Sequence, residues 1–224
     1  MTTIIAGLDE VGYGAIAGPV VVAVAAFPAM SLRIPGVRDS KKIFNRAERI
    51  RLYETILSRA IWFGLGYASP KYVDEKGLRA AWDAAALMAL QDCSCVIDRL
   101  IVDGEFTVPI PRDSFLSRLV PIQAAIPKAD RDHWEVSAAS ILAKEARDRA
   151  MEDAHPFYPQ YNWLSNMGYG TKQHMEAIEQ FGPSPWHRLS YGKGKHNQKK
   201  RARKKAAQRR MLETSKFCPS DMLR

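Results

Sequence analysis

The sequence predicts an α/β fold in which helices flank a mixed sheet. Short apolar runs typical of strands alternate with longer segments of helical periodicity, which is the pattern of α/β proteins. The first two runs form an early strand pair joined by a glycine-rich turn, and this favours a mixed sheet. The chain has 224 residues, of which 46% are apolar, so we expect one domain with a substantial core.

Four segments carry the strand signal of β-branched and other apolar residues bounded by turn residues. They are 3–9, 19–27, 61–68 and 96–102. The segment 104–128 is rich in proline, so we expect it to lack regular structure.

Helical periodicity predicts four helices between and after these strands. They cover about 46–59, 77–91, 133–154 and 171–181. Asn45 and Glu48 fit a capping box at the start of the first helix. The third ends at His155-Pro156 and the fourth at Gly182-Pro183, because proline cannot continue a helix.

Acidic residues stand at the ends of two predicted strands. Asp9 and Glu10 follow the first apolar run, and Asp103 closes the strand 96–102. Asp130 precedes the long helix. If the strands are neighbours, the carboxylates converge, and their repulsion favours a bound cation. Oxygen ligands from separate elements fit one or two hard divalent ions, Mg²⁺ or Mn²⁺.

Two other interpretations of the acidic turn compete with a metal site. An Asp-Glu pair alone is more often a solvated turn. The loop Gly12-Tyr13-Gly14 also suggests dinucleotide binding, but Pro19 and a strand-like run follow where that motif requires a helix.

Several short motifs follow one another in order along the chain. They are Gly7–Gly14 with Ala17–Val21, Asp39-Ser40-Lys41-Lys42, Val102-Asp103-Gly104, Lys128-Ala129-Asp130, Ala138–Lys144 with Arg147-Asp148, Tyr158–Tyr161, Gly168–Lys172 and His187–Ser190. Together they make the chain resemble type 2 ribonuclease H, the ribonuclease HII family. The resemblance covers about residues 4–192. It implies a ribonuclease H-like fold, hydrolysis of the RNA strand in RNA–DNA hybrids, and cleavage at ribonucleotides embedded in DNA. Two divalent ions and products with 3′-hydroxyl and 5′-phosphate ends are also implied.

The resemblance assigns roles to particular residues. It implies that the catalytic, metal-binding carboxylates are Asp9, Glu10, Asp103 and Asp130. Near Asp130, the acidic residues Asp132 and Glu135 are competitors for the fourth place. For substrate binding it implies Gly12, Tyr13, Gly14, Lys41, Lys42 and Tyr169. A solvated lysine pair is the alternative for Lys41 and Lys42, and Asp148 is expected to form an ion pair with Lys144 one helical turn away.

The chain departs from the family pattern at two places. Gly12-Tyr13-Gly14 stands where the family usually has Gly-Arg-Gly, so a guanidinium that would make charge-assisted hydrogen bonds is absent from the loop. Asn166-Met167 stands where His-Lys usually precedes Gly-Tyr-Gly. Both changes remove positive charge, so substrate preference is more open than reaction type.

The positive charge of the chain lies at its C-terminal end. Residues 188–224 hold 13 Lys and Arg against 2 Asp and Glu, a net charge of +11, whereas residues 1–187 hold 20 against 22. We therefore expect a catalytic domain over 1–192 and a basic, flexible tail over 193–224. Attraction to nucleic-acid phosphates is the favoured role for the tail. A solubilising tail or a localisation signal is the alternative.

We expect the protein to be a monomer, and cysteine usage and the N-terminal sequence favour the cytoplasm. Three cysteines without metal-ligand spacing suit a reducing compartment. No basic segment precedes the first apolar run, which argues against a secretory signal. The longest apolar run, 19–30, is too short to span a bilayer.

Two alternatives to ribonuclease HII activity remain. Ribonuclease HIII also tends to lack the loop arginine, but this chain starts directly at the first strand and leaves no room for an extra N-terminal domain. A catalytically silent hybrid-binding protein is the second alternative, although all four carboxylates are present.

Overall fold

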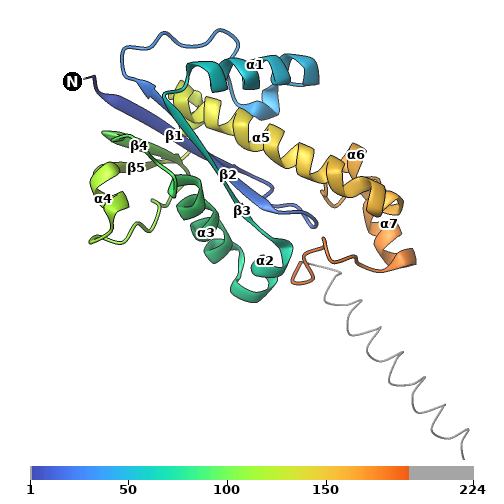
Figure 1. The fold of residues 1–224 in the computed structure, drawn as a ribbon. Helices are drawn as coiled ribbons and strands as arrows, with labels where there is room; N and C mark the ends of the chain where they lie inside the picture. Colours follow the sequence, from blue (N-terminus) through green and yellow to red (C-terminus); the bar gives the residue numbers. More distant parts are fainter. Residues whose placement is uncertain (1, 192–224) are drawn as a thin grey trace, which may run out of the picture.

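One five-stranded mixed sheet forms the centre of the computed structural model, which describes residues 2–191 (Figure 1). Its strands are β1 (Ile4–Val11), β2 (Val20–Pro28), β3 (Trp62–Ala68), β4 (Arg99–Asp103) and β5 (Gln123–Ile126), in the order β3-β2-β1-β4-β5. Strand β2 is antiparallel to both β1 and β3, whereas β4 is parallel to both β1 and β5. The mixed α/β sheet predicted from the sequence is thus confirmed.

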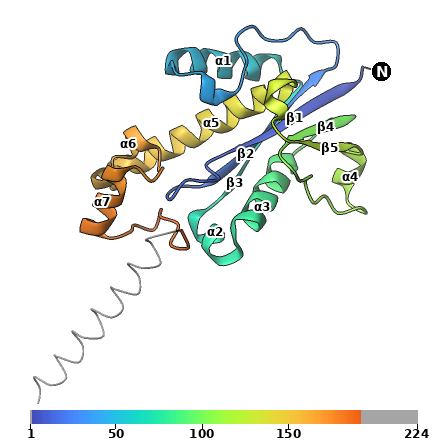
Figure 2. The ribbon, with the colours of Figure 1, turned by 180° about the vertical axis from the view of Figure 1, so that it is seen from behind.

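Helices cover both faces of the sheet. On one face lie α1 (Arg46–Arg59) and the long α5 (Trp134–Ala154), and on the other lie α2 (Pro70–Lys76), α3 (Leu78–Leu90) and α4 (Phe115–Leu119) (Figures 1 and 2). The short α6 (Trp163–Asn166) and α7 (Lys172–Phe181) lie near the C-terminal end of α5 (Figure 2). This end of the molecule holds a separate aromatic cluster that includes Tyr161 and Trp163.

Two glycines allow the main helices to touch the backbone of the sheet. A Cβ atom on Gly7 of β1 would lie 2.2 Å from the backbone of Glu135 and Val136 at the start of α5. A Cβ atom on Gly66 of β3 would lie 1.8 Å from the carbonyl oxygen of Ala85 in α3. Only glycine permits such close approach. The start of α5 is therefore held directly over the strand that ends in the acidic pair.

The strand predictions are correct except around β5. The run 96–102 becomes strand only from Arg99, and the proline-rich segment 104–128 contains both α4 and β5, so the expectation of no regular structure there is wrong. The sequence of β5, Gln-Ala-Ala-Ile, has little β propensity, and its pairing with β4 supplies the stabilisation. Ser114 caps α4 through its hydroxyl, which accepts from the backbone N–H of Ser117.

The four predicted helices are present, with differences at their ends. Asn45 caps α1 by accepting from the backbone N–H groups of Ala47 and Glu48, whereas the Glu48 carboxylate forms an ion pair with Arg38. The capping box is thus confirmed on its Asn45 side. Helix α2 was not predicted, although Pro70 at its first turn and Gly77 at its end are typical helix boundaries.

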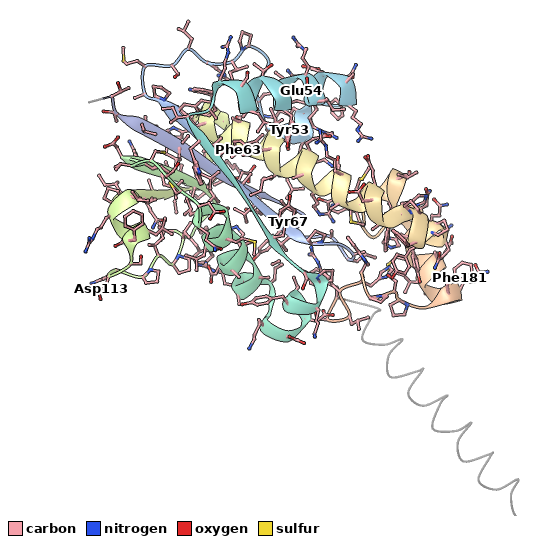
Figure 3. All side chains as sticks on the ribbon, in the orientation of Figure 1. Tyr53, Glu54, Phe63, Tyr67, Asp113 and Phe181 are labelled. Atoms are coloured by element: carbon pink, nitrogen blue, oxygen red, sulfur yellow. The ribbon has the colours of Figure 1, made fainter. Side chains whose placement is uncertain are left out.

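The edge strand β3 exposes aromatic side chains. Phe63 and Tyr67, which Figure 3 labels, are each 40% exposed. Within residues 2–191, every helix is too short or too polar to cross a membrane. The basic tail expected over 193–224 lies outside the described residues.

Candidate active site

The register of β1 and β4 brings two of the acidic residues together. Leu8 is paired with Val102 in this parallel ladder, so the next residues, Asp9 and Asp103, lie at the same edge of the sheet. Successive strand residues point to opposite faces. Asp9 accordingly lies towards α5 and Glu10 towards α3.

Asp9 is a buried carboxylate surrounded by negative charge. Its side chain is only 6% exposed. Burial raises the pKa of Asp9 well above its usual value, and the neighbouring carboxylates of Glu10 and Asp103 raise it further. A hydrogen bond with the Ser140 hydroxyl acts in the opposite direction, and that hydroxyl also lies 2.7 Å from the hydroxyl of Ser40. The site thus concentrates negative charge that favours a bound cation.

Glu10 is held from the other face of the sheet. The indole Nε1–H of Trp82 in α3 donates to the Glu10 Oε2 at 3.2 Å. Burial raises the pKa of Glu10, while the bond from Trp82 and the nearby Lys41 oppose that rise. The bond fixes the orientation of a carboxylate whose pairing with Asp103 is repulsive.

The segment after β5 completes the acidic group. The Asp103 Oδ1 accepts from the backbone N–H of Ala129 at 2.9 Å, which places the 3₁₀ turn η2 (Ala129–Arg131) against β4. Burial raises the pKa of Asp130, and the charges of Asp39 and Asp103 raise it further. Asp130 therefore lies within electrostatic reach of the other carboxylates, whereas Asp132 is exposed to solvent.

The acidic group suits a hard divalent cation. Within residues 2–191, no three His, Cys, Asp or Glu side chains are arranged so that they could hold a metal ion together. The donor chemistry nevertheless fits, because Asp9, Glu10, Asp103 and Asp130 offer carboxylate oxygens, which Mg²⁺ and Mn²⁺ prefer. The raised pKa of Asp9 reflects burial and repulsion that a bound cation would offset.

Lysine side chains lie beside these carboxylates. Lys41 and Lys42 belong to the 3₁₀ turn η1 (Ser40–Lys42), and the Asp39 carboxylate caps it by accepting from the Lys41 backbone N–H at 3.0 Å. Burial lowers the pKa of Lys41, but the charges of Asp9, Asp39 and Glu10 outweigh it and raise the pKa overall. Lys41 thus interacts electrostatically with the acidic group, whereas the alternative interpretation expected a lysine that contacts only solvent.

A cleft of about 510 Å³ adjoins the acidic group. It is lined by Glu10, Val11, Gly12, Tyr13, Gly14, Ser40, Lys41, Lys144 and Tyr169. Tyr13 and Tyr169 are both 40% exposed, so each presents a ring to solvent. The predicted substrate-binding residues other than Lys42 therefore line one continuous cleft.

Arg147 holds the two loops that frame this cleft. From α5 its buried guanidinium donates to the carbonyl oxygens of Ala17 at 2.9 Å, Pro19 at 3.1 Å and Met167 at 2.7 Å. Its guanidinium carbon also lies 5.3 Å from the ring centre of Tyr169. Arg147 therefore links the segment after the Gly12–Gly14 turn to the loop of Tyr169, alongside the backbone N–H groups of Ile16 and Ala17 that donate to the Gly168 carbonyl oxygen.

A pair of buried histidines supports Tyr169 from behind. The backbone N–H of Ser184 donates to His187 Nδ1 at 2.9 Å, so the hydrogen of this ring lies on Nε2. That Nε2 is 3.0 Å from His174 Nε2, which also accepts from the indole of Trp163. His174 then donates from Nδ1 to the carbonyl oxygen of Tyr169 at 2.9 Å. All of these donor and acceptor roles of the two imidazole rings are satisfied only when both rings are neutral.

This pair predicts that acid destabilises the fold. Burial and the neighbouring His174 lower the pKa of His187 to about 4, compared with about 6.5 in the unfolded chain. Between these values the unfolded chain binds the extra proton, so the contribution to stability is complete above pH 6.5 and falls towards pH 4. Urea unfolding should show a loss of up to about 3 kcal/mol over this range.

The His187→Gln variant isolates this effect from other titrating groups. It should lower stability at pH 7 but show a shallower fall between pH 6.5 and 4. An identical fall in wild type and variant would contradict the neutral pair. The neighbouring Arg188 also has a structural role, because its guanidinium donates to the carbonyl oxygens of Tyr13 and Gly18.

Sequence reasoning missed several residues that shape the site. Trp82 contacts Glu10, and Arg79 lies beside it in a second cleft of about 160 Å³. Both residues lie in the alanine-rich helix α3. In the sequence, the Arg79 guanidinium and the Trp82 indole N–H were the only features of this segment that could have indicated a role in the site. The expected ion pair between Asp148 and Lys144 is present, and Asp148 also accepts from Arg49 of α1.

Comparison with known proteins identifies the family. A family model described as ribonuclease HII matches residues 6–193. A Bacillus thuringiensis (strain Al Hakam) protein named ribonuclease HII is 43% identical over 190 residues, covering 84% of this chain and 69% of its own. The crystal structure of ribonuclease H2 from Pyrococcus horikoshii OT3 superposes with a TM-score of 0.71 at 26% identity, over 87% of this chain and 96% of the other.

A more distant structure shares the fold. The Bst-RNase HIII structure in complex with Mn²⁺ superposes with a TM-score of 0.63 at 20% identity, over 87% of this chain and 68% of the other. The match to the family model covers nearly the whole described chain, including the acidic strand ends and the glycine turn. The chain belongs to the ribonuclease HII family.

Proposed function

We propose that this chain is a metal-dependent endoribonuclease that hydrolyses the RNA strand of RNA–DNA hybrids and cleaves at ribonucleotides embedded in duplex DNA. The observation that carries this proposal is the environment of Asp9. Its buried carboxylate has a pKa raised by burial and by two further carboxylates, at the edge of a cleft with exposed tyrosines and a lysine. Membership of the ribonuclease HII family supports it.

In this proposal four carboxylates, Asp9, Glu10, Asp103 and Asp130, would hold two divalent ions, Mg²⁺ or Mn²⁺. Ions bound there supply a Lewis acid for the scissile phosphate and lower the pKa of a bound water. The products carry 3′-hydroxyl and 5′-phosphate ends.

The protein's own groups bind and orient the substrate. Gly12, Tyr13 and Gly14 form the turn whose backbone approaches the ribose, and the 2′-hydroxyl is the group that distinguishes RNA from DNA. Tyr169 packs against the adjoining sugar, held in place by Arg147 and His174. Lys41 and Lys42 attract the phosphate backbone beside the carboxylates.

Cleavage of two substrates tests this proposal. One duplex carries a single ribonucleotide in DNA, the other is a continuous RNA–DNA hybrid, and both are incubated in Mg²⁺, in Mn²⁺ and in EDTA. We expect cleavage of both in the metals and none in EDTA. No cleavage of either duplex would overturn the enzyme proposal and favour a silent hybrid-binding protein.

The same assay decides substrate preference. Loss of cleavage at the single ribonucleotide, with the hybrid still cut, would indicate the ribonuclease HIII preference that the missing loop arginine left open. Membership of the ribonuclease HII family favours cleavage of both. The cysteine content supports action in the cytoplasm.

We further propose that residues 193–224 add affinity for nucleic acid beyond that of the catalytic domain, residues 1–192. The support is their charge: 12 of the 33 Lys and Arg residues lie in this segment. Each phosphate neutralised by such a side chain releases counterions, which makes binding weaken as salt rises.

Deletion of residues 196–224 should therefore weaken hybrid binding and flatten its salt dependence. The logarithm of the affinity should fall less steeply with the logarithm of salt, by roughly 0.9 for each phosphate that the tail no longer neutralises. Turnover at saturating substrate should change little, because the carboxylates remain. Fluorescence anisotropy from roughly 50 to 300 mM salt, where phosphate contacts dominate, measures this slope. An unchanged slope would show that the tail does not contact the duplex.

A further inference from the structure

A second cleft adjoins Glu10 on the side of α3. It is lined by Glu10, Tyr13, Arg79, Trp82, Asp103, Gly104, Glu105 and Phe106. Glu10 and Tyr13 line both clefts, so they form a ridge between the two. A strand whose scissile phosphate lies at Glu10 and Asp103 has one neighbouring nucleotide in each cleft.

Arg79 is the cation of this second cleft. Its guanidinium carbon lies 3.9 Å from the ring centre of Phe106 and 5.3 Å from that of Trp82. The Nε–H donates to Asp83 at 2.9 Å, one helical turn further along α3. The guanidinium is thus held by stacking against Phe106 and by one ion pair.

The remaining donors of Arg79 are available for a ligand. Its side chain is 42% exposed, and among residues 2–191 no hydrogen bond engages either Nη group. A surface arginine that served only to pair with Asp83 would need no aromatic platform, and such exposed pairs stabilise little. A guanidinium fixed along one edge is well suited to a phosphate, which it contacts through two parallel N–H groups.

The charge of the cleft makes this cation necessary. The lining contains the carboxylates of Glu10, Asp103 and Glu105, and within the described chain Arg79 is its one basic residue. Divalent ions neutralise the first two, but Glu105 would still repel a backbone phosphate. Tyr13 carries no positive charge, and Arg79 lies close enough to influence its pKa.

We propose that Arg79, stacked on Phe106, binds the backbone phosphate next to the scissile one, in the cleft beside α3. This inference rests on the proposed function, because it takes the strand to cross Glu10 and Asp103. The ligand is a phosphodiester of the cleaved strand. Arg79 acts as a specificity-determining residue for the register of cleavage.

Neutral linkages test the contact directly. Duplexes with one ribonucleotide are made with a methylphosphonate, which carries no charge, at the linkage on either side of the scissile phosphate. Wild type, Arg79→Ala and Arg79→Lys are compared on the charged duplex and on both neutral ones, by kcat/KM. Binding of the same duplexes is measured in an Asp9→Asn background by anisotropy.

On the charged duplex we expect Arg79→Ala to lower kcat/KM and affinity by about tenfold, the usual effect of removing a charge-assisted hydrogen bond. On one of the two neutral duplexes the variant should show no further loss relative to wild type. Arg79→Lys should recover part of the loss, because it keeps the charge but not the stacked fork. The control is Arg118→Ala on α4. The next residue, Leu119, accepts through its carbonyl oxygen from the backbone N–H of Ile97, which comes just before β4. Arg118 therefore lies near the start of β4, whereas the carboxylates lie at its end.

An equal loss for Arg79→Ala on all three duplexes would overturn the proposal, as would no loss on the charged duplex. An equal loss is the result expected if removing Arg79 only disturbed Trp82, which Arg79 contacts. The hydrogen bond from Trp82 to Glu10 does not depend on the charge of a neighbouring linkage. Failure of wild type to cleave the charged duplex would instead count against the proposed function. The binding measurements would then still decide whether Arg79 reads the neighbouring phosphate.

Discussion

Replacing Asp9 by asparagine is expected to lower the cleavage rate by several orders of magnitude while hybrid binding stays within a few-fold of wild type. Asn has nearly the same shape and can still accept from the backbone N–H of Glu10, which lies 2.7 Å from Asp9 Oδ1. It cannot supply the negative charge that holds a divalent ion at the scissile phosphate. The binding clefts, in contrast, are unchanged.

The same substitution should stabilise the metal-free protein. Burial and the charges of Glu10 and Asp103 raise the pKa of Asp9, which means that its ionised form is unfavourable in the fold. Asparagine removes this repulsion. In EDTA at pH 7 the Tm of Asp9→Asn should therefore exceed that of wild type, as expected where a site sacrifices stability for function.

Single-turnover cleavage, anisotropy and thermal unfolding measure the three quantities. Asp113→Asn provides the matched control, because Asp113 is exposed beside α4, far along the molecule from the strand ends (Figure 3). It should leave all three unchanged. Near wild-type turnover of Asp9→Asn at saturating Mg²⁺ would show that the metal-site proposal is wrong.

Much of the fold could be predicted because local signals and burial agree. The runs that became β1 and β2 are apolar and bounded by turns, and Thr171 and Asn45 mark helix starts with side chains that accept backbone N–H groups. The elements that could not be predicted have weak local signals. Strand β5 depends on its pairing with β4, and α4 is a five-residue helix in a proline-rich segment.

The acidic site was predictable for a topological reason. Asp9 and Asp103 lie at strand ends, and parallel neighbours place such residues at one edge. The contacts from α3 follow no such rule, since Trp82 and Arg79 meet Glu10 and Phe106 only after the sheet is assembled. The backbone at position 167 also has a structural role, because Met167 takes a positive φ of 47° and offers its carbonyl oxygen to Arg147.

Arg147→Met should be the most destabilising of these substitutions, with an expected loss of roughly 3–5 kcal/mol in the free energy of unfolding. The side chain is fully buried, and burial lowers its pKa to about 10, so it remains a cation at neutral pH. Methionine fills a similar volume but donates nothing. The carbonyl oxygens of Ala17, Pro19 and Met167 would lose their partner, and each unsatisfied buried acceptor costs about 1–3 kcal/mol.

Arg147→Lys should recover little of this loss, because one ammonium group cannot reach three carbonyl oxygens on two loops as the guanidinium fork does. Arg149→Met is the matched control, because Arg149 is two residues further along α5 and its guanidinium is half-exposed. Its partner Glu145 is buried but keeps Arg49 as a second partner, so the loss should be less than about 1 kcal/mol. Urea unfolding measures all three variants. Because Arg147 spans the glycine turn and the loop of Tyr169, the folded fraction of Arg147→Met should also cleave more slowly at low temperature. If Arg147→Met unfolded at the wild-type urea concentration, the backbone hydrogen bonds from Ile16 and Ala17 to the Gly168 carbonyl oxygen would be sufficient to hold the two loops together.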